Sequence, residues 1–273
     1  MPSSSTRSRT ALVIVTLSLC TAGTAAAHLH PEMTVAWTAY VSATERRIAR
    51  ELESPRGFLA LDYVQDAAAE RQAVLGGASV VRKMDTIDSR GGRMAVPSAL
   101  VHHWRGDVLI PGVTVAALVA QLQAAAPRPQ EDVLESRVLD RGPDWMWVRL
   151  KLQRKTVITV VYNTEHIVTF DRYGSTRATS MSTATKIAEV SNPDTPEERE
   201  LPAGGDRGFL WRLNAYWRYE EVNGGVIAEC ESISLSRDVP SLVRYFVNPL
   251  VESTARESMA RTLLAIRARF AKG

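Results

Sequence analysis

The sequence contains little cysteine and little excess charge of either sign. Only 2 of its 273 residues are cysteine, and a chain of this length can bury a stable core without disulfide bonds. Lys and Arg total 33 against 30 Asp and Glu, which leaves no charge excess that would indicate a nucleic-acid partner. Hydrophobic residues make up 45% of the chain, and this content excludes a disordered polypeptide.

Familiar catalytic and metal-binding motifs are also missing. There is no G-x-S-x-G, no phosphate-binding loop, no G-x-G-x-x-G after a strand, no H-E-x-x-H and no C-x-x-C. Because each of these patterns serves a particular chemistry, their absence leaves no catalytic constellation to assign. We therefore expect no cofactor and no metal, and a non-enzymatic role is favoured over an enzymatic one.

The first 27 residues have the pattern of an export signal. Arg7 and Arg9 precede the apolar run Ala11–Leu19, which is too short to cross a bilayer, and small residues follow up to Ala27. This order is typical of a signal peptide cleaved after Ala27, and an uncleaved anchor is the less favoured alternative. Cleavage removes Cys20 and lowers Lys and Arg from 33 to 31 against 30 Asp and Glu. We expect a periplasmic or secreted protein.

Cleavage at this position would also expose a histidine motif. The mature chain would begin His28-Leu29-His30. A free amine, two amide nitrogens and a third-position imidazole form a square-planar site suited to Cu(II) or Ni(II). A short tail without metal is the favoured alternative, because moving the cleavage site by one residue removes the motif.

Hydrophobic spacing divides the rest of the chain into helices, a long run of strands and a terminal helix. Helical spacing predicts helices at 34–53, 66–75, 114–126 and 253–271, the last separated by Pro249 from an apolar piece at 242–247. Apolar runs and alternation predict strands at 58–64, 99–110 (with a turn near Gly106), 133–139, 145–154, 156–163, 166–173, 177–189, 208–222 and 225–235. Short turns between strands require antiparallel neighbours. The predicted fold class is therefore α+β, a twisted antiparallel sheet covered on its apolar face by the terminal helix.

The hairpin at 208–235 allows the most detailed prediction. Asn223-Gly224 favours a two-residue type I′ turn. The pairs that follow from this turn are Trp217 with Cys230, Tyr219 with Ala228, Ala215 with Ser232, Leu213 with Ser234 and, on the other face, Arg218 with Glu229. On the inward face, aromatic residues of the first strand stand beside small residues of the second. The aromatic residues are Phe209, Trp211, Trp217 and Tyr219, and the small ones are Ala228, Cys230, Ser232 and Ser234. Such a face fits either close packing of a helix or a cavity, and close packing is the favoured interpretation.

Alternation also assigns histidines and charges to faces of the sheet. His102 and His103 point to opposite faces, and the apolar neighbours Leu100 and Trp104 place His102 on the inward face. A pocket histidine can act as a general acid or base, although a hydrogen-bonded core histidine is the commoner case. The charged residues that alternation places on the solvent side are Arg149, Lys151, Glu229 and Glu231.

Five segments carry a resemblance to a known superfamily. They are His102–Gly106 (H-H-W-R-G), Ile110–Gly112 (I-P-G), Phe209–Tyr219, Gly224–Arg237 and the terminal helix. Residues 55–272 resemble the START-like, helix-grip (SRPBCC) superfamily, and its exported bacterial members in particular. The resemblance implies a sheet wrapped around the C-terminal helix with an apolar cavity between them. The chain then divides into a signal peptide (1–27), an N-terminal helical extension (28–54) and a START-like helix-grip domain (55–273).

These observations predict an exported, soluble binder or carrier of a hydrophobic small molecule or lipid. The residues expected to line its cavity are His102, Trp104, Trp211, Leu213, Trp217, Tyr219, Cys230 and Ser232, with His102 or Ser232 as polar anchors. Because the superfamily includes polyketide cyclases and aromatases, an enzyme that uses His102 is one alternative. An interaction module of the cell envelope, with a filled core and no ligand, is another. We expect a monomer with no nucleic-acid partner and transient membrane contact at most.

Overall fold

The computed structural model describes residues 29–126, 129, 132–155, 159–238 and 241–270, so the predicted signal peptide and His28 lie outside the described residues. The helices are α1 (Pro31–Glu53), η1 (a 3₁₀ turn, Ala60–Tyr63), α2 (Ala67–Leu75), α3 (Val115–Ala124) and α4 (Ser241–Phe270). The strands are β1 (Val80–Lys83), β2 (Ala99–Pro111), β3 (Val133–Arg141), β4 (Trp145–Lys155), β5 (Thr159–Tyr173), β6 (Arg177–Ser191), β7 (Arg199–Glu200), β8 (Arg212–Val222) and β9 (Gly225–Arg237).

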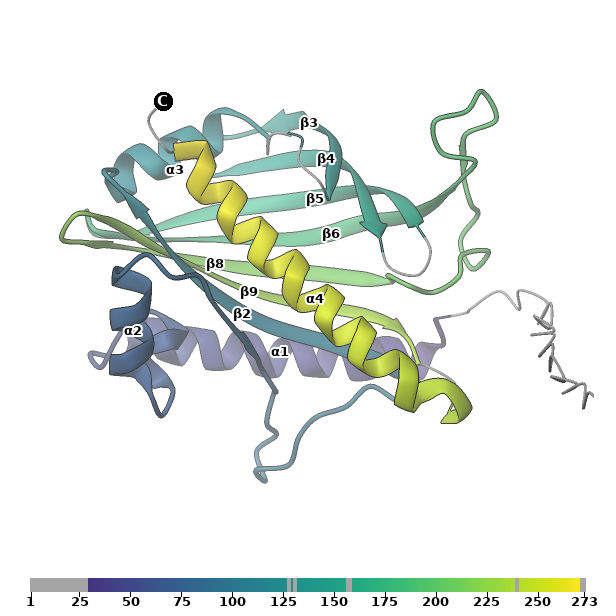
Figure 1. Cartoon of the computed structure of the whole chain (residues 1–273), viewed down its shortest axis with the longest axis horizontal. Coiled ribbons are helices and arrows are strands. Elements are labelled where there is room, and N and C mark those ends of the chain that lie inside the picture. Colours follow the sequence, from purple (N-terminus) through teal and green to yellow (C-terminus); the bar gives the residue numbers. More distant parts are fainter. Residues whose placement is uncertain (1–28, 127–128, 130–131, 156–158, 239–240, 271–273) are drawn as a thin grey trace, which may run out of the picture.

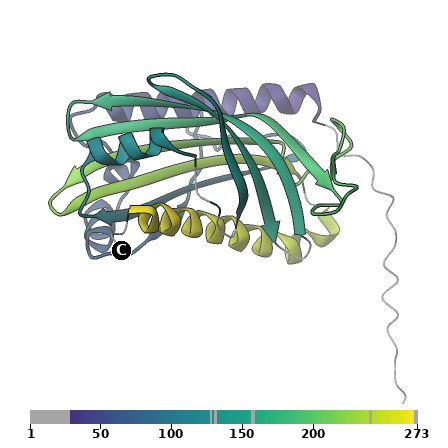
Figure 2. The same cartoon turned by 90° about the horizontal axis from the view of Figure 1, so that it is seen from above.

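One antiparallel sheet lies between two long helices (Figures 1 and 2). Its strand order is β1-β2-β9-β8-β6-β5-β4-β3, and β7 pairs with β6. Helix α4 crosses one face, called the α4 face below, and α1 lies along the opposite face, called the α1 face (Figure 2). The molecule is thus an α+β helix-grip fold with an additional N-terminal helix, as the sequence predicts.

The hairpin of β8 and β9 has the predicted register. Trp217 pairs with Cys230, and Arg218 pairs with Glu229 on the other face. Gly224 at the turn has a φ of 92°, a left-handed conformation that glycine adopts without strain. The turn dipeptide and the opposite-charge pair therefore determine the register, as expected.

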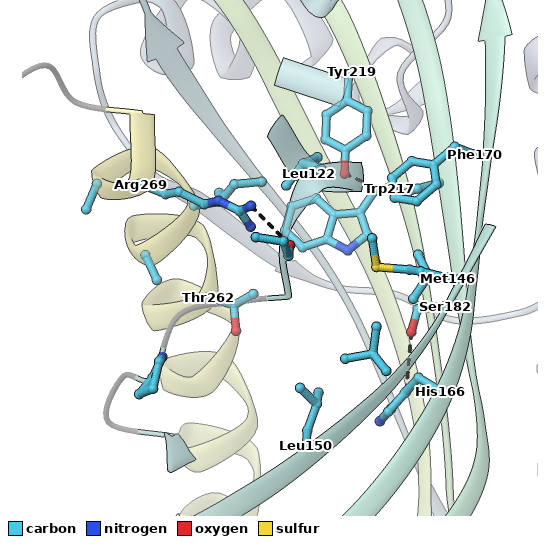
Figure 3. A pocket seen from close by; sticks show the side chains of 18 residues that line it. Leu122, Met146, Leu150, His166, Phe170, Ser182, Trp217, Tyr219, Thr262 and Arg269 are labelled. Atoms are coloured by element: carbon cyan, nitrogen blue, oxygen red, sulfur yellow. Dashed lines mark hydrogen bonds between the residues drawn. The ribbon is translucent and has the colours of Figure 1, made fainter. Parts of the chain in front are cut away.

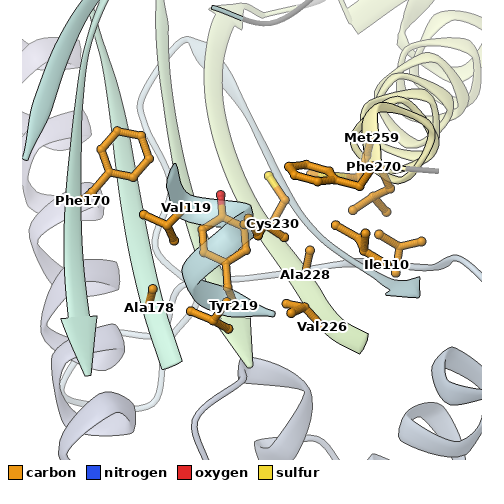
Figure 4. Close-up of a cluster of buried hydrophobic side chains, with 14 of the residues drawn as sticks. Ile110, Val119, Phe170, Ala178, Tyr219, Val226, Ala228, Cys230, Met259 and Phe270 are labelled. Carbon is orange, nitrogen blue, oxygen red and sulfur yellow. The ribbon is translucent and has the colours of Figure 1, made fainter. Parts of the chain in front are cut away.

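Small residues let α4 approach β2 and β9 closely. Cys230 and Ala228 lie in one buried cluster with Met259, Leu263 and Phe270 of α4 (Figure 4). Gly106 on β2 pairs with Cys230, and a Cβ atom at Gly106 would lie 2.5 Å from Leu263 Cδ1. Close helix packing, the favoured interpretation of the small residues, is confirmed for this part of the sheet.

The strand predicted at 58–64 is wrong, because carboxylates bind the backbone donors that a strand would pair. Asp62 accepts hydrogen bonds from two backbone N–H groups before η1. Glu229 of β9 accepts from the N–H groups of Ala60 and Leu61 at 2.8 Å each. The segment therefore curls into η1.

Several predicted breaks are also absent. β2 passes through Gly106 without a turn, because the glycine serves the approach of α4 rather than a bend. β5 is one strand where two segments were predicted, and α4 continues through Pro249 as one helix. The short strands β1 and β7 were missed, since four and two residues are too few to show a period.

The α1 face buries charges that alternation assigned to solvent. Glu229 and Glu231 are 0% and 1% exposed, because α1, η1 and α2 cover this face and supply their partners. Glu231 Oε1 contacts Arg47 of α1 and lies 2.6 Å from His103 Nε2. Lys151 is buried as well, since loop residues Asp194 and Glu198 contact its ammonium group. Arg149 alone of the four is exposed, as predicted.

Candidate functional site

A cavity of about 450 Å³ lies on the α4 face, between the sheet and the C-terminal half of α4 (Figure 3). Strands β4, β5, β6 and β8 form one wall, α4 forms the opposite wall, and the end of α3 with the residues after it closes one end. The lining residues are Leu122, Ala125, Pro129, Met146, Val148, Leu150, His166, Val168, Phe170, Ser180, Ser182, Trp217, Tyr219, Thr262, Ala265, Ile266, Ala268 and Arg269.

The cavity exists because two adjacent rows of side chains on α4 have different surroundings. One row, with Met259 and Leu263, packs in the core cluster against β2 and β9. The next row faces the cavity and includes Thr262, Ala265 and Ile266, which follow the spacing of one helical face. Because α4 packs against β1 and β2 at one edge of the sheet, the short Thr262 and Ala265 side chains leave space in front of β4 to β8.

The sheet side of the cavity is mainly apolar, with an aromatic wall. The rings of Trp217 and Tyr219 stack with centroids 6.1 Å apart and planes 11° apart. Met146 and Phe170 add further apolar surface from β4 and β5 (Figure 3). A flat apolar wall of this kind suits an aliphatic or polycyclic molecule.

Two pairs of polar side chains interrupt this apolar surface. Ser180 Oγ and Tyr219 Oη are 3.1 Å apart, and burial raises the pKa of Tyr219, which keeps its phenol neutral. Ser182 Oγ lies 3.3 Å from His166 Nδ1 (Figure 3). Burial lowers the pKa of His166 to about 4, so the imidazole is neutral at pH 7. The cavity therefore offers uncharged hydrogen-bonding groups within an apolar enclosure.

Arg269 joins the two helices at the α3 end of the cavity. Its Nη2 donates to the backbone carbonyl of Gln121 at 2.6 Å and to that of Ala125 at 3.2 Å. These carbonyls lie at the C-terminus of α3, where a cation is favourable. The guanidinium thus holds the end of α4 against α3 and closes this end of the cavity.

The structure brings two of the eight predicted site residues to this cavity, Trp217 and Tyr219. Trp104 and Cys230 share the α4 face but lie in the core cluster beneath the helix. Ser232 pairs with Trp104 in the same region, and His102 Nε2 lies 2.9 Å from Ser236 Oγ. None of these four lines the cavity, because α4 packs against this part of the sheet.

The remaining two predicted residues lie elsewhere. Trp211 packs on the α1 face with Met33 and Trp37, and its inward assignment is wrong because β8 begins only at Arg212. Phe209, assigned to the same face, is 39% exposed. Leu213 lies on the α4 face beside Tyr162, away from the cavity.

Sequence reasoning missed the polar residues of the cavity, His166, Ser180 and Ser182. His166 could have been predicted, because its spacing of two from Val168 and Phe170 puts the three side chains on one face of a strand. In β6 a bulge interrupts this alternation, so the faces of Ser180 and Ser182 cannot be assigned from the whole strand. His166 pairs with Ala184 while Glu165 pairs with Lys186, so Thr185 is an extra residue with no register position opposite it on β5.

Within the described residues, no group of three or more His, Cys, Asp or Glu side chains is arranged to hold a metal ion. His28 of the predicted copper motif lies outside those residues. In the same part of the chain, no helix combines the length and apolar character needed to cross a bilayer.

The chain is similar in structure to lipid-transfer proteins of the START type, while no protein-family model and no curated protein matches it. A STAR-related lipid transfer protein fragment from Xanthomonas axonopodis is 17% identical, with coverage of 70% of this chain and 99% of that one and a TM-score of 0.44. Human STARD10 is 12% identical, with coverages of 74% and 78% and a TM-score of 0.42. The Zhui aromatase/cyclase from Streptomyces sp. R1128 is 11% identical, with coverages of 63% and 94% and a TM-score of 0.36.

Proposed function

We propose that this protein binds a hydrophobic small molecule or lipid in the cavity between its sheet and α4. The observation that supports this proposal is the cavity itself, about 450 Å³ in volume, with the stacked Trp217 and Tyr219 in its wall. Volumes of this size are typical of small-molecule sites, which combine apolar walls with a few placed polar groups. Ser180, Ser182 and His166 are such groups.

Binding is favoured over catalysis by the state of His166. Its Nδ1 faces Ser182 Oγ at 3.3 Å, and its Nε2 faces Thr164 Oγ1 at 3.0 Å. A general base needs a nitrogen within reach of the proton that it removes. The Ser182 hydroxyl carries a proton within reach, but an imidazole with a pKa of about 4 is too weak a base to remove it at pH 7. The imidazole therefore orients its neighbours, and the site serves to hold a ligand.

A binding experiment with a cavity-filling variant tests the proposal. Nile red, an uncharged apolar dye, should bind the purified protein, and native mass spectrometry should detect ligands retained from expression. Ala265→Phe places a ring in the cavity and should lower dye affinity at least about tenfold. Leu264→Phe, on an exposed position of the same helix, is the matched control and should bind normally. Failure of the wild-type protein to bind any apolar compound would contradict the proposal.

Export is part of the same proposal and rests on the pattern of Arg7, Arg9 and Ala11–Leu19. The mass of the protein recovered from its natural compartment should correspond to a chain that begins at His28. A full-length mass would contradict cleavage after Ala27.

A further inference from the structure

A chain of hydrogen bonds lies beside and within the cavity wall, and the group at its end gives it a direction. The chain ends at the backbone carbonyl of Leu150, which can only accept. Thr164 Oγ1 donates its single hydrogen to this carbonyl at 3.3 Å. Toward His166 Nε2, which is 3.0 Å away, the Thr164 oxygen can therefore only accept. Nε2 must carry a hydrogen and donate it.

This direction determines the tautomer of His166. Burial lowers the pKa of His166 to about 4, so the ring carries one hydrogen at pH 7, and that hydrogen is on Nε2. Nδ1 then presents a lone pair. Ser182 Oγ, 3.3 Å from Nδ1, must donate its own hydrogen there. The Ser182 oxygen retains lone pairs and has no hydrogen left to donate.

Ser182 lies in the cavity wall, on the strand next to His166 (Figure 3). We propose that the hydrogen-bond chain makes Ser182 a dedicated acceptor, which selects apolar alcohols over ketones or esters of the same carbon skeleton. An alcohol can donate a hydrogen bond to the Ser182 oxygen. A ketone oxygen can only accept, so it would form no hydrogen bond with Ser182 and the two oxygens would repel each other. This inference rests on the proposed binding function and specifies the ligand's chemical class.

The other polar pair of the cavity has no such direction. Ser180 Oγ and Tyr219 Oη lie 3.1 Å apart, and either oxygen can be the donor. One hydroxyl hydrogen of the pair stays available, so the pair can donate to a ketone as well as accept from an alcohol. The discrimination between alcohols and ketones therefore belongs to Ser182.

Three planar tricyclic compounds test the inference: 9-fluorenol, 9-fluorenone and the hydrocarbon fluorene. Their affinities are measured by displacement of Nile red at pH 7. We expect 9-fluorenol to bind about three- to tenfold more tightly than 9-fluorenone, as one net hydrogen bond allows. Thr164→Val removes the acceptor of Nε2–H without changing the cavity lining, since Thr164 is fully buried beside His166 and does not line the cavity. The imidazole hydrogen can then move to Nδ1, and the affinity ratio should fall toward one.

Two further variants separate this effect from loss of stability. His166→Phe frees the Ser182 hydroxyl to donate, and it should also bring the ratio toward one. Thr185→Val is the control, because Thr185 is exposed, lines no part of the cavity, and its hydroxyl donates to the Glu165 carbonyl outside the chain. Equal binding of fluorenol and fluorenone by the wild type, with fluorene also bound, overturns the inference and leaves the proposed function standing. Absence of binding by all three compounds and by Nile red overturns both.

Discussion

At the residue scale, the clearest constraint lies at Gly106, because side chains of α4 occupy the space that a side chain at this position would need. A Cβ atom there would lie 2.5 Å from Leu263 Cδ1 and 2.8 Å from Met259 Cγ. Both neighbours belong to the packed row of α4. One methyl group at position 106 would therefore push the helix away from β2.

We predict that Gly106→Ala lowers the free energy of unfolding by about 1–3 kcal/mol, the usual cost of overpacking a core. Urea denaturation measures this loss. Leu263→Ala removes the clashing methyl groups, so the double variant should lose less stability than the sum of the two single variants. Additive losses would contradict the contact.

Alternation along the strands predicted the faces of Trp217, Tyr219 and Cys230 correctly, because pairing across a two-residue turn is a local property. The burial of Glu231 could not be predicted this way. It depends on α1, which lies almost two hundred positions earlier in the sequence and covers that face. The cavity position likewise depends on which edge of the sheet α4 contacts, and strand alternation does not specify this.

At the scale of the elements, α1 is attached to the sheet by buried ionic contacts. Arg47 of α1 contacts Glu231 of β9, and Glu51 lies 2.6 Å from Arg218 Nη2 of β8. Tyr40 Oη lies 2.9 Å from His103 Nδ1. Contacts to Arg47 and His103 lower the pKa of Glu231 to about 2 against the effect of burial. Helix α1 is thus part of the same folded unit as the sheet.

We predict that Glu231→Gln lowers the free energy of unfolding by about 2–4 kcal/mol, because it leaves Arg47 and His103 without their shared carboxylate. Urea denaturation measures the loss, and hydrogen exchange should show α1 opening first. Glu165→Gln is the control. Its carboxylate lies 3.9 Å from a partly exposed Lys186, so its effect should stay within about 0.5 kcal/mol. Equal effects of the two substitutions would contradict the prediction.

At the scale of the whole molecule, the buried His166 makes stability depend on pH. Its pKa is about 4 in the folded protein and about 6.5 in an unfolded chain. Because the folded-state pKa is lowered, the unfolded chain binds the proton first as pH falls. The stabilising effect of a neutral His166 is complete above about pH 6.5 and is lost as pH falls toward about 4.

We predict that, between pH 7 and pH 4.5, the wild type loses about 2.5 kcal/mol more stability than His166→Gln does. Urea denaturation at the two pH values measures both free energies. The difference between the two proteins isolates His166 from the carboxylates that titrate in the same range. A constant difference across the two pH values would show that His166 is not buried as described.

The bulge at Thr185 has a consequence for insertions and deletions. Thr185 is exposed and lines no part of the cavity, yet it changes which positions of β6 face inward. Ser180 and Ser182 face the cavity before it, whereas Ile187 packs inward after it. Removal of this one residue would turn one of these two sets outward. Which polar side chains line the cavity wall therefore depends on the length of β6 as well as on its sequence. Related chains without the extra residue would have a different cavity lining.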